Sequence, residues 1–235
     1  MFLKKKIRIL CFVVAEGITS GFPFRFLQQS SGSDQMDAAN AVLRTWGRRC
    51  TKIVYFSDSP DLRPAGVDVL PLKSRPTTGW NAFRESLIQI SNSYLDNFDW
   101  FFRADLDTYV VLENLRYYLS ILDNTAMHYV GHTYESWGIQ YNAASAGFAL
   151  SRGALHALHN SLIKGHCPAG SVRDGDVELG RCLSEVGIVP HDTRDSGGHA
   201  RFLVLDPESH LVPGGIPWTS SFWSQTKYKV QDVSK

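Results

Sequence analysis

The sequence lacks the segments that mark several large classes of protein. No apolar run in its 235 residues approaches the roughly 20 residues that a helix needs to span a bilayer. It has no Asn-x-Ser/Thr glycosylation site and no HExxH, GxSxG, GxGxxG or phosphate-binding P-loop motif. Zinc proteases, serine hydrolases, dinucleotide-binding dehydrogenases and P-loop kinases therefore have no support.

Neither sign of charge is in excess. The 24 basic and 23 acidic residues give a formal net charge of +1, with no basic stripe and no acidic tail. We therefore predict no nucleic-acid partner. Hydrophobic residues make up 43% and charged residues 20%, as in ordinary globular proteins, and the length allows one sizeable domain.

Cysteine is also sparse. The four residues Cys11, Cys50, Cys167 and Cys182 show no CxxC spacing, which argues against a structural zinc site. An even number is compatible with two disulfides in an oxidising compartment. Four buried thiols would fit the same count, so composition leaves both alternatives open.

Strand and helix patterns alternate along the chain. An apolar face of period 3.6 runs from Trp80 to Tyr94, and a second runs from Leu112 to Leu122. Short apolar runs predict strands at 7–15, 53–56, 67–72, 100–102, 129–130 and 148–150, with a further helix at 38–46. This alternation predicts an α/β domain with a largely parallel sheet.

Asp105 and Asp107 directly follow the strand predicted at 100–102. If the backbone stays extended there, both carboxylates share one face and Leu106 faces the core. Their mutual repulsion favours a divalent cation, and Mg²⁺ or Mn²⁺ prefers oxygen ligands. Carboxyl ends of strands are also where open α/β sheets bind ligands. The bare Asp-x-Asp pattern also arises by chance in a chain of this length, so its position carries the interpretation.

A second acidic cluster lies between Asp174 and Glu178. Its composition is that of an exposed, charged helix start, because Asp favours the first turn of a helix. Taken alone, the cluster would be assigned no chemistry.

Several separated blocks together resemble the core 1 β1,3-galactosyltransferases, which belong to the fringe-like glycosyltransferase family 31. The similar blocks are RILC at 8–11, TWGRRC at 45–50, WFFRADLDTYV at 100–110, ENLR at 113–116, AGFALS at 146–151, DVELGRC at 176–182, ESHL at 208–211 and FW at 222–223. Their order along most of the chain makes the set specific, although each block alone is not.

The resemblance implies a GT-A glycosyltransferase fold, which is α/β with a Rossmann-like, mostly parallel sheet flanked by helices. It implies a single domain over 1–235, with a nucleotide-sugar half at about 1–110 and an acceptor half at about 111–235. The implied reaction is inverting transfer of galactose from UDP-galactose to the 3-hydroxyl of GalNAc α-linked to Ser or Thr of a glycoprotein.

The resemblance also implies roles for residues of the two acidic clusters. Asp105 and Asp107 would hold Mn²⁺ (or Mg²⁺) on the diphosphate, and Arg103 would contact the phosphate or uridine side of the donor. Asp176 would be the general base, with Asp174 as its rival because the two lie so close in sequence.

Three aromatic residues are the candidates for the acceptor site. Tyr141, Phe222 and Trp223 would form an apolar platform for the acceptor sugar. Core packing is the alternative explanation for each of them.

The family's cysteine pairing would join Cys11 to Cys50 and Cys167 to Cys182. By the resemblance, that places the domain in the lumen of the secretory pathway, in the Golgi. A membrane anchor is expected of the family but is not seen in this chain, and a homodimer is possible.

Three departures from the family pattern accompany these expectations. Ala144-Ser145 replaces a Gly-Gly pair, and Gly175 stands where the family has an acidic residue. The chain ends at Lys235, before the block that carries the family's histidine metal ligand, so we expect the acceptor half to be incomplete there. Two alternatives stay open: a fringe-like transferase with another UDP-sugar donor, and a non-catalytic chaperone or lectin-like relative.

Overall fold

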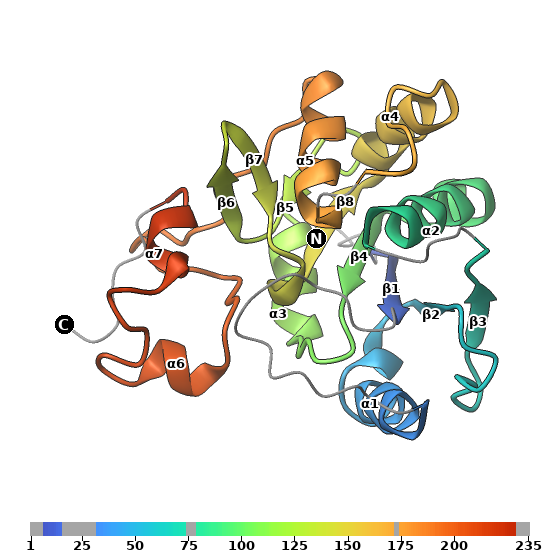
Figure 1. The fold of residues 1–235 in the computed structure, drawn as a ribbon, viewed down its shortest axis with the longest axis horizontal. Helices are drawn as coiled ribbons and strands as arrows, with labels where there is room; N and C mark the ends of the chain where they lie inside the picture. Colours follow the sequence, from blue (N-terminus) through green and yellow to red (C-terminus); the bar gives the residue numbers. More distant parts are fainter. Residues whose placement is uncertain (1–6, 16–31, 74–78, 172–173, 229–235) are drawn as a thin grey trace, which may run out of the picture.

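The computed structural model describes residues 7–15, 32–73, 79–171 and 174–228 (Figure 1). A six-stranded sheet in the order β3-β2-β1-β4-β8-β5 forms its centre. The strands are β1 (Ile9–Ala15), β2 (Lys52–Ser57), β3 (Asp68–Pro71), β4 (Trp100–Ala104), β5 (Tyr129–Val130) and β8 (Phe148–Ser151). The first four pair in parallel, and β8 runs antiparallel to both β4 and β5.

Helices cover both faces of this sheet. They are α1 (Gly32–Thr45), α2 (Gly79–Tyr94), α3 (Leu112–Leu119), α4 (Arg152–Ile163) and α5 (Gly175–Glu185), with 3-10 turns η1 (Gly47–Arg49), η2 (Leu95–Asn97) and η3 (Ala144–Ala146). The expected α/β fold class, with a Rossmann-like, mostly parallel sheet flanked by helices, is confirmed.

Strand alternation divides the core into two layers. All seven residues of β1 are buried, so this strand has no solvent-facing side. Leu10, Phe12 and Val14 pack under α2, α4 and α5, whereas the alternate residues Ile9 and Cys11 pack under α1 and α3. A strand buried on both faces reads as a continuous apolar run, which is why the sequence pattern located it correctly.

A smaller unit lies beside the sheet. Strands β6 (Thr133–Ser136) and β7 (Ile139–Asn142) form an antiparallel hairpin. The short helices α6 (Pro207–Leu211) and α7 (Ser221–Gln225) follow later in the chain, and α7 lies against the hairpin (Figure 1). Tyr134, Tyr141, Val177 and Phe222 form the small core of this unit.

Most of the predicted elements are confirmed, and the differences are local. The helix expected at 112–122 ends at Leu119, because residues 120–122 form a turn. The hairpin, α4, α6 and α7 were not predicted. In the part of the chain that the structure describes, no helix is long and apolar enough to cross a membrane.

Candidate active site

The first acidic cluster forms a tight turn at the carboxyl end of β4. The backbone N–H of Thr108 donates to the carbonyl of Asp105 at 3.2 Å, and the N–H of Asp105 donates to the Thr108 hydroxyl at 3.0 Å. The extended conformation assumed for Asp105–Asp107 is therefore wrong, since residues 106 and 107 belong to a turn. Leu106 nevertheless packs on the core beneath the sheet, as expected.

The two carboxylates of this turn differ in their surroundings. Asp107 is exposed, whereas the side chain of Asp105 is only 19% exposed. Asp105 Oδ1 lies 2.9 Å from Nη2 of Arg103, whose own side chain is 8% exposed. The Arg103 guanidinium also lies over the ring of Phe83, 5.3 Å from its centroid. Arg103, expected to contact the donor, is thus a buried partner of Asp105 here.

Asp176 lies in the first turn of α5, on the other side of the site. Its Oδ2 accepts a hydrogen bond of 2.8 Å from the backbone N–H of Ala144. Burial raises the pKa of Asp176 from 3.8 to about 6; the Arg103 charge and the Ala144 hydrogen bond oppose the shift, and the charges of Asp105 and Asp174 add to it. The fold therefore places Asp105 and Arg103 near enough to Asp176 for their charges to act on it, although the sequence separates the two aspartates by 71 positions.

Asp174, the rival carboxylate, has a different environment. It is exposed and occupies the N-cap position of α5, where its side chain makes no capping hydrogen bond. The helix predicted from the composition of this cluster is confirmed. Its expected exposure is not, because Glu178 is 2% exposed and pairs with Arg181.

Close packing fixes α5 next to the hairpin and α2. A Cβ atom added at Gly180 would lie 2.5 Å from the carbonyl oxygen of Gln140 and 2.6 Å from Cβ of Tyr141. A Cβ added at Gly175 would lie 3.4 Å from the backbone of Gly79. Gly180 therefore lets α5 approach the hairpin at backbone distance, whereas a Cβ at Gly175 would make only ordinary van der Waals contact.

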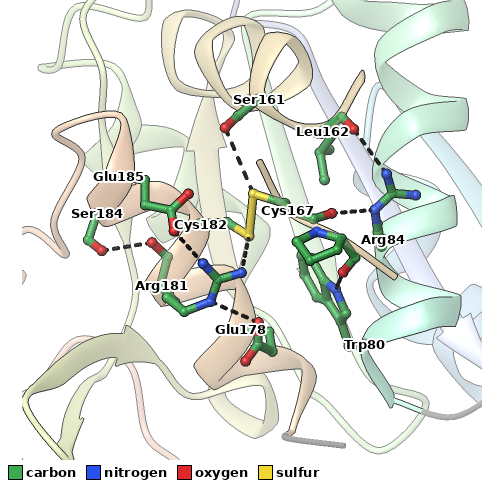
Figure 2. Close-up of a disulfide and its surroundings, with 11 residues drawn as sticks. Trp80, Arg84, Ser161, Leu162, Cys167, Glu178, Arg181, Cys182, Ser184 and Glu185 are labelled. Atoms are coloured by element: carbon green, nitrogen blue, oxygen red, sulfur yellow. Dashed lines mark hydrogen bonds and ion pairs between the residues drawn. A yellow bond between two sulfur atoms is a disulfide. The ribbon is translucent and has the colours of Figure 1, made fainter. Parts of the chain in front are cut away.

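A disulfide between Cys167 and Cys182 holds the middle of α5 (Figure 2). Arg84 of α2 donates to the carbonyl of Cys167 at 2.7 Å and to that of Leu162 at 2.9 Å, and Nη2 of Arg181 lies 3.7 Å from the sulfur of Cys182. The second disulfide joins Cys11 in β1 to Cys50. Both pairings implied by the family resemblance are confirmed, and the alternative of four thiols is wrong.

The aromatic candidates do not lie together on the surface. Tyr141 and Phe222 are each 4% exposed and belong to the small core beside the sheet. Trp223 is half-buried and stacks on Trp218, with ring centroids 5.4 Å apart and an interplanar angle of 24°. Trp218, which sequence reasoning missed, is 80% exposed. Core packing therefore accounts for Tyr141 and Phe222, and the exposed ring of the stacked pair is that of Trp218.

The residues of the turn suit a hard divalent cation that shares its coordination with a phosphate. Such ions are commonly held by one or two carboxylates plus substrate phosphate oxygens. Asp107 is open to solvent and Asp105 lies beside it. The described residues contain no group of three or more His, Cys, Asp or Glu that could hold a metal ion by themselves.

Comparison with known proteins adds an independent line of observation. The sequence model of the family described as Fringe-like matches residues 35–195, more than half of the chain. A glycoprotein-N-acetylgalactosamine 3-beta-galactosyltransferase 1 from Xenopus laevis is 28% identical over 222 residues, which cover 94% of this chain and 57% of the frog protein. A beta-1,3-glucosyltransferase from Mus musculus is 27% identical over 158 residues, 65% of this chain and 31% of the mouse protein.

The chain thus spans little more than half the length of the frog relative. Among solved structures, a CMP:2-keto-3-deoxy-manno-octonic acid synthetase complexed with CTP is similar with a TM-score of 0.47 at 12% identity. That similarity covers 78% of this chain and 89% of the synthetase, and it is too loose to carry a conclusion.

Proposed function

This chain belongs to the Fringe-like family, and on that premise we propose that it is a metal-dependent galactosyltransferase. The proposed donor is UDP-galactose, and the proposed acceptor is the 3-hydroxyl of GalNAc α-linked to Ser or Thr of a glycoprotein. The observation that carries the proposal is the meeting of the two acidic clusters around Arg103. The frog relative's name supports transfer of galactose to N-acetylgalactosamine of a glycoprotein; UDP as the carrier and the α-linkage to Ser or Thr follow from the family resemblance.

In the proposed reaction the acceptor hydroxyl attacks the anomeric carbon in a single displacement. The new glycosidic bond forms as the bond to UDP breaks, and the hydroxyl proton passes to the carboxylate of Asp176. The Ala144 N–H holds Oδ2, which leaves Oδ1 free to face the acceptor. With a pKa of about 6, the carboxylate is mostly ionised at pH 7 and still basic enough to accept a proton.

Asp105 and Asp107 would hold Mn²⁺ or Mg²⁺ at the diphosphate. A bound divalent cation supplies charge stabilisation to the departing diphosphate. Arg103 keeps the carboxylate of Asp105 oriented through their 2.9 Å ion pair. In this scheme the donor half would end near residue 110 and the acceptor half would begin there, as the family resemblance implies.

The acceptor sugar would lie against the face formed by Trp218 and Trp223 beside α5. Trp223 packs on the small core that contains Val177, the residue after Asp176. An exposed indole is a suitable surface for the apolar face of a sugar ring. The two disulfides support a location in the oxidising lumen of the secretory pathway, which we propose as the compartment.

The test is a transfer assay with a GalNAc-peptide and a panel of UDP-sugars, with Mn²⁺ or with a chelator. We expect Mn²⁺-dependent addition of one hexose from UDP-galactose, detected by mass. Asp176→Asn should abolish most of it, while the matched Asp174→Asn protein stays active. No transfer from any donor would overturn the proposal in favour of the non-catalytic relative.

A second donor also has a specific observation behind it. The mouse relative is a beta-1,3-glucosyltransferase, so UDP-glucose is the leading alternative to UDP-galactose. Because the two hexoses have equal mass, the product must be digested with a β-galactosidase. A product that resists this enzyme would favour the glucosyl donor.

A further inference from the structure

Thr108, the residue after the Asp-x-Asp pair, is buried and hydrogen-bonded on all sides. Thr108 is only 6% exposed. The Thr108 hydroxyl accepts a hydrogen bond from the backbone N–H of Asp105. The backbone N–H of Thr108 donates to the carbonyl of Asp105 and closes the turn. The indole N–H of Trp46 donates to the Thr108 carbonyl at 2.9 Å. A buried polar side chain in such a network fixes one backbone geometry.

The same hydroxyl reaches the opposite half of the site. It donates towards the carbonyl oxygen of Ser145 at 3.4 Å, 37 positions further along the chain. Ser145 lies in η3, and the preceding residue of that turn, Ala144, donates its N–H to Asp176. The short turn η3 therefore contacts Thr108 through Ser145 and Asp176 through the neighbouring residue Ala144.

The η3 turn itself is pressed onto the end of β4. Gly147, its C-terminal cap, has a φ of 69°, and a Cβ there would lie 2.5 Å from Cζ of Phe102. The backbone at Gly147 therefore leaves no room for a side chain. A turn packed this closely can transmit the position of one neighbour to another.

We propose that Thr108 is a positioning residue that sets the carboxylates of the Asp105–Asp107 turn relative to Asp176. The proposal rests on the proposed function, because it assigns the donor side of the site to the turn and the acceptor side to Asp176. Loss of the hydroxyl leaves both sets of ligand-binding groups in place but alters the distance between them. Turnover should fall while donor binding persists, because misplacement of reacting groups by about 1 Å can lower rates 10²-fold.

Two variants of Thr108 separate the hydroxyl from the methyl group. Thr108→Val keeps the shape of the side chain and removes the hydroxyl, whereas Thr108→Ser keeps the hydroxyl. We expect Thr108→Val to lower kcat about 10- to 100-fold with KM for UDP-galactose within about threefold of wild type. Ser should restore most of the rate. Thr125→Val, which removes the hydroxyl of an exposed Thr bonded to Asp123, is the control.

Two readouts do not depend on turnover. The rise in melting temperature caused by UDP and Mn²⁺ should be kept in the Val protein. Exchange of the Asp105 amide hydrogen should be faster in Thr108→Val than in Thr108→Ser, since Thr108→Val removes the hydroxyl that accepts the hydrogen bond from this amide. If Thr108→Val does not fold, Thr108→Ala takes its place, because it removes the hydroxyl without adding any atom.

The outcomes separate the two proposals. A wild-type protein without transfer activity defeats the proposed function, and the amide exchange still tests the position of the turn. The positioning role is overturned if Thr108→Val has the kcat of wild type, or if Thr108→Ser is as slow as Thr108→Val. The positioning role is also overturned if Thr108→Val loses the melting-temperature rise caused by UDP and Mn²⁺ to the same degree as it loses kcat.

Discussion

The two acidic regions of the candidate site use the same side chain in opposite surroundings. Asp105 lies in the turn after β4 and is paired at 2.9 Å with a buried guanidinium. Asp176 lies in the first turn of α5, where its carboxylate accepts a hydrogen bond from a neutral backbone N–H, that of Ala144. Burial raises the pKa of Asp176 to about 6, and the nearby Arg103 charge reduces that shift without cancelling it.

The difference shows how one residue type can be divided between two tasks. The carboxylate oxygens of the turn are the ligand type that hard divalent cations prefer. A buried carboxylate whose pKa approaches neutrality is suited to exchange a proton. Arg103 lies within reach of both, so its single charge contributes to each region.

Removal of the proposed proton acceptor, Asp176, is the strongest way to break this comparison. Asp176→Asn keeps the size of the side chain and an oxygen for the Ala144 N–H, but the amide cannot take a proton. We expect transfer to fall roughly 10²- to 10⁴-fold, the usual contribution of a general base. Initial rates with UDP-galactose and GalNAc-peptide measure the change.

UDP binding provides the control for this variant. The melting-temperature shift caused by UDP with Mn²⁺ should match that of wild type. A fully active Asp176→Asn protein, together with an inactive Asp174→Asn protein, would transfer the base role to the exposed N-cap carboxylate.

Removal of the exposed ligand in the turn should have the converse effect. In wild type we expect Mn²⁺ to increase the stabilisation by UDP, because the ion bridges carboxylate and diphosphate. Ligand at 100 times its dissociation constant stabilises a protein by about 2.7 kcal/mol. Asp107→Asn should lose most of the metal-dependent part, whereas Asp176→Asn should keep it. Equal UDP effects with Mn²⁺ and with chelator in wild type would contradict the metal role.

The pH dependence of the rate sharpens the comparison further. The base must be ionised, so kcat/KM should fall about tenfold per pH unit below a pKa near 6 and level off above it. Since the Arg103 charge lowers the pKa of Asp176, Arg103→Met should move this limb to higher pH. A limb near pH 4 in wild type would assign the proton transfer to an ordinary, exposed carboxylate instead.

The central sheet could be predicted because its strands are read locally. Each strand buried on both faces is a short apolar run, and β1, β2, β4 and β8 all carry that signal. The hairpin was missed because its turn consists of two residues, Trp137 and Gly138, with φ of 52° and 75°. The x-Gly dipeptide between alternating segments was the available signal for it.

The site was predictable only in part for a different reason. The Asp105–Asp107 pair stands out because it ends a strand, whereas Asp176 was identified through family resemblance alone. Its hydrogen bond to Ala144 joins positions 32 apart, and its electrostatic contact with Asp105 joins positions 71 apart. Burial, pKa and such distant contacts depend on tertiary packing, which local patterns do not encode.

The smallest expected effect contrasts the stability of two matched variants. The folded state raises the pKa of Asp176 from 3.8 to about 6, so the folded protein binds this proton more tightly than the unfolded chain. The resulting contribution to the free energy of unfolding is present below pH 4 and is lost as pH rises to about 6.

At pH 7 the ionised Asp176 carboxylate therefore lowers the free energy of unfolding by up to about 3 kcal/mol. Asp176→Asn should be about 1–3 kcal/mol more stable than wild type at this pH, with the gain vanishing near pH 4. Asp105→Asn should instead lose about 1–3 kcal/mol, because a neutral amide replaces the charged partner of the buried Arg103 guanidinium. Urea denaturation of both variants at pH 7 and pH 4, with the disulfides intact, measures the two signs. If Asp176→Asn is destabilised at pH 7, the carboxylate is held as firmly as that of Asp105, and the division of tasks between the two regions fails.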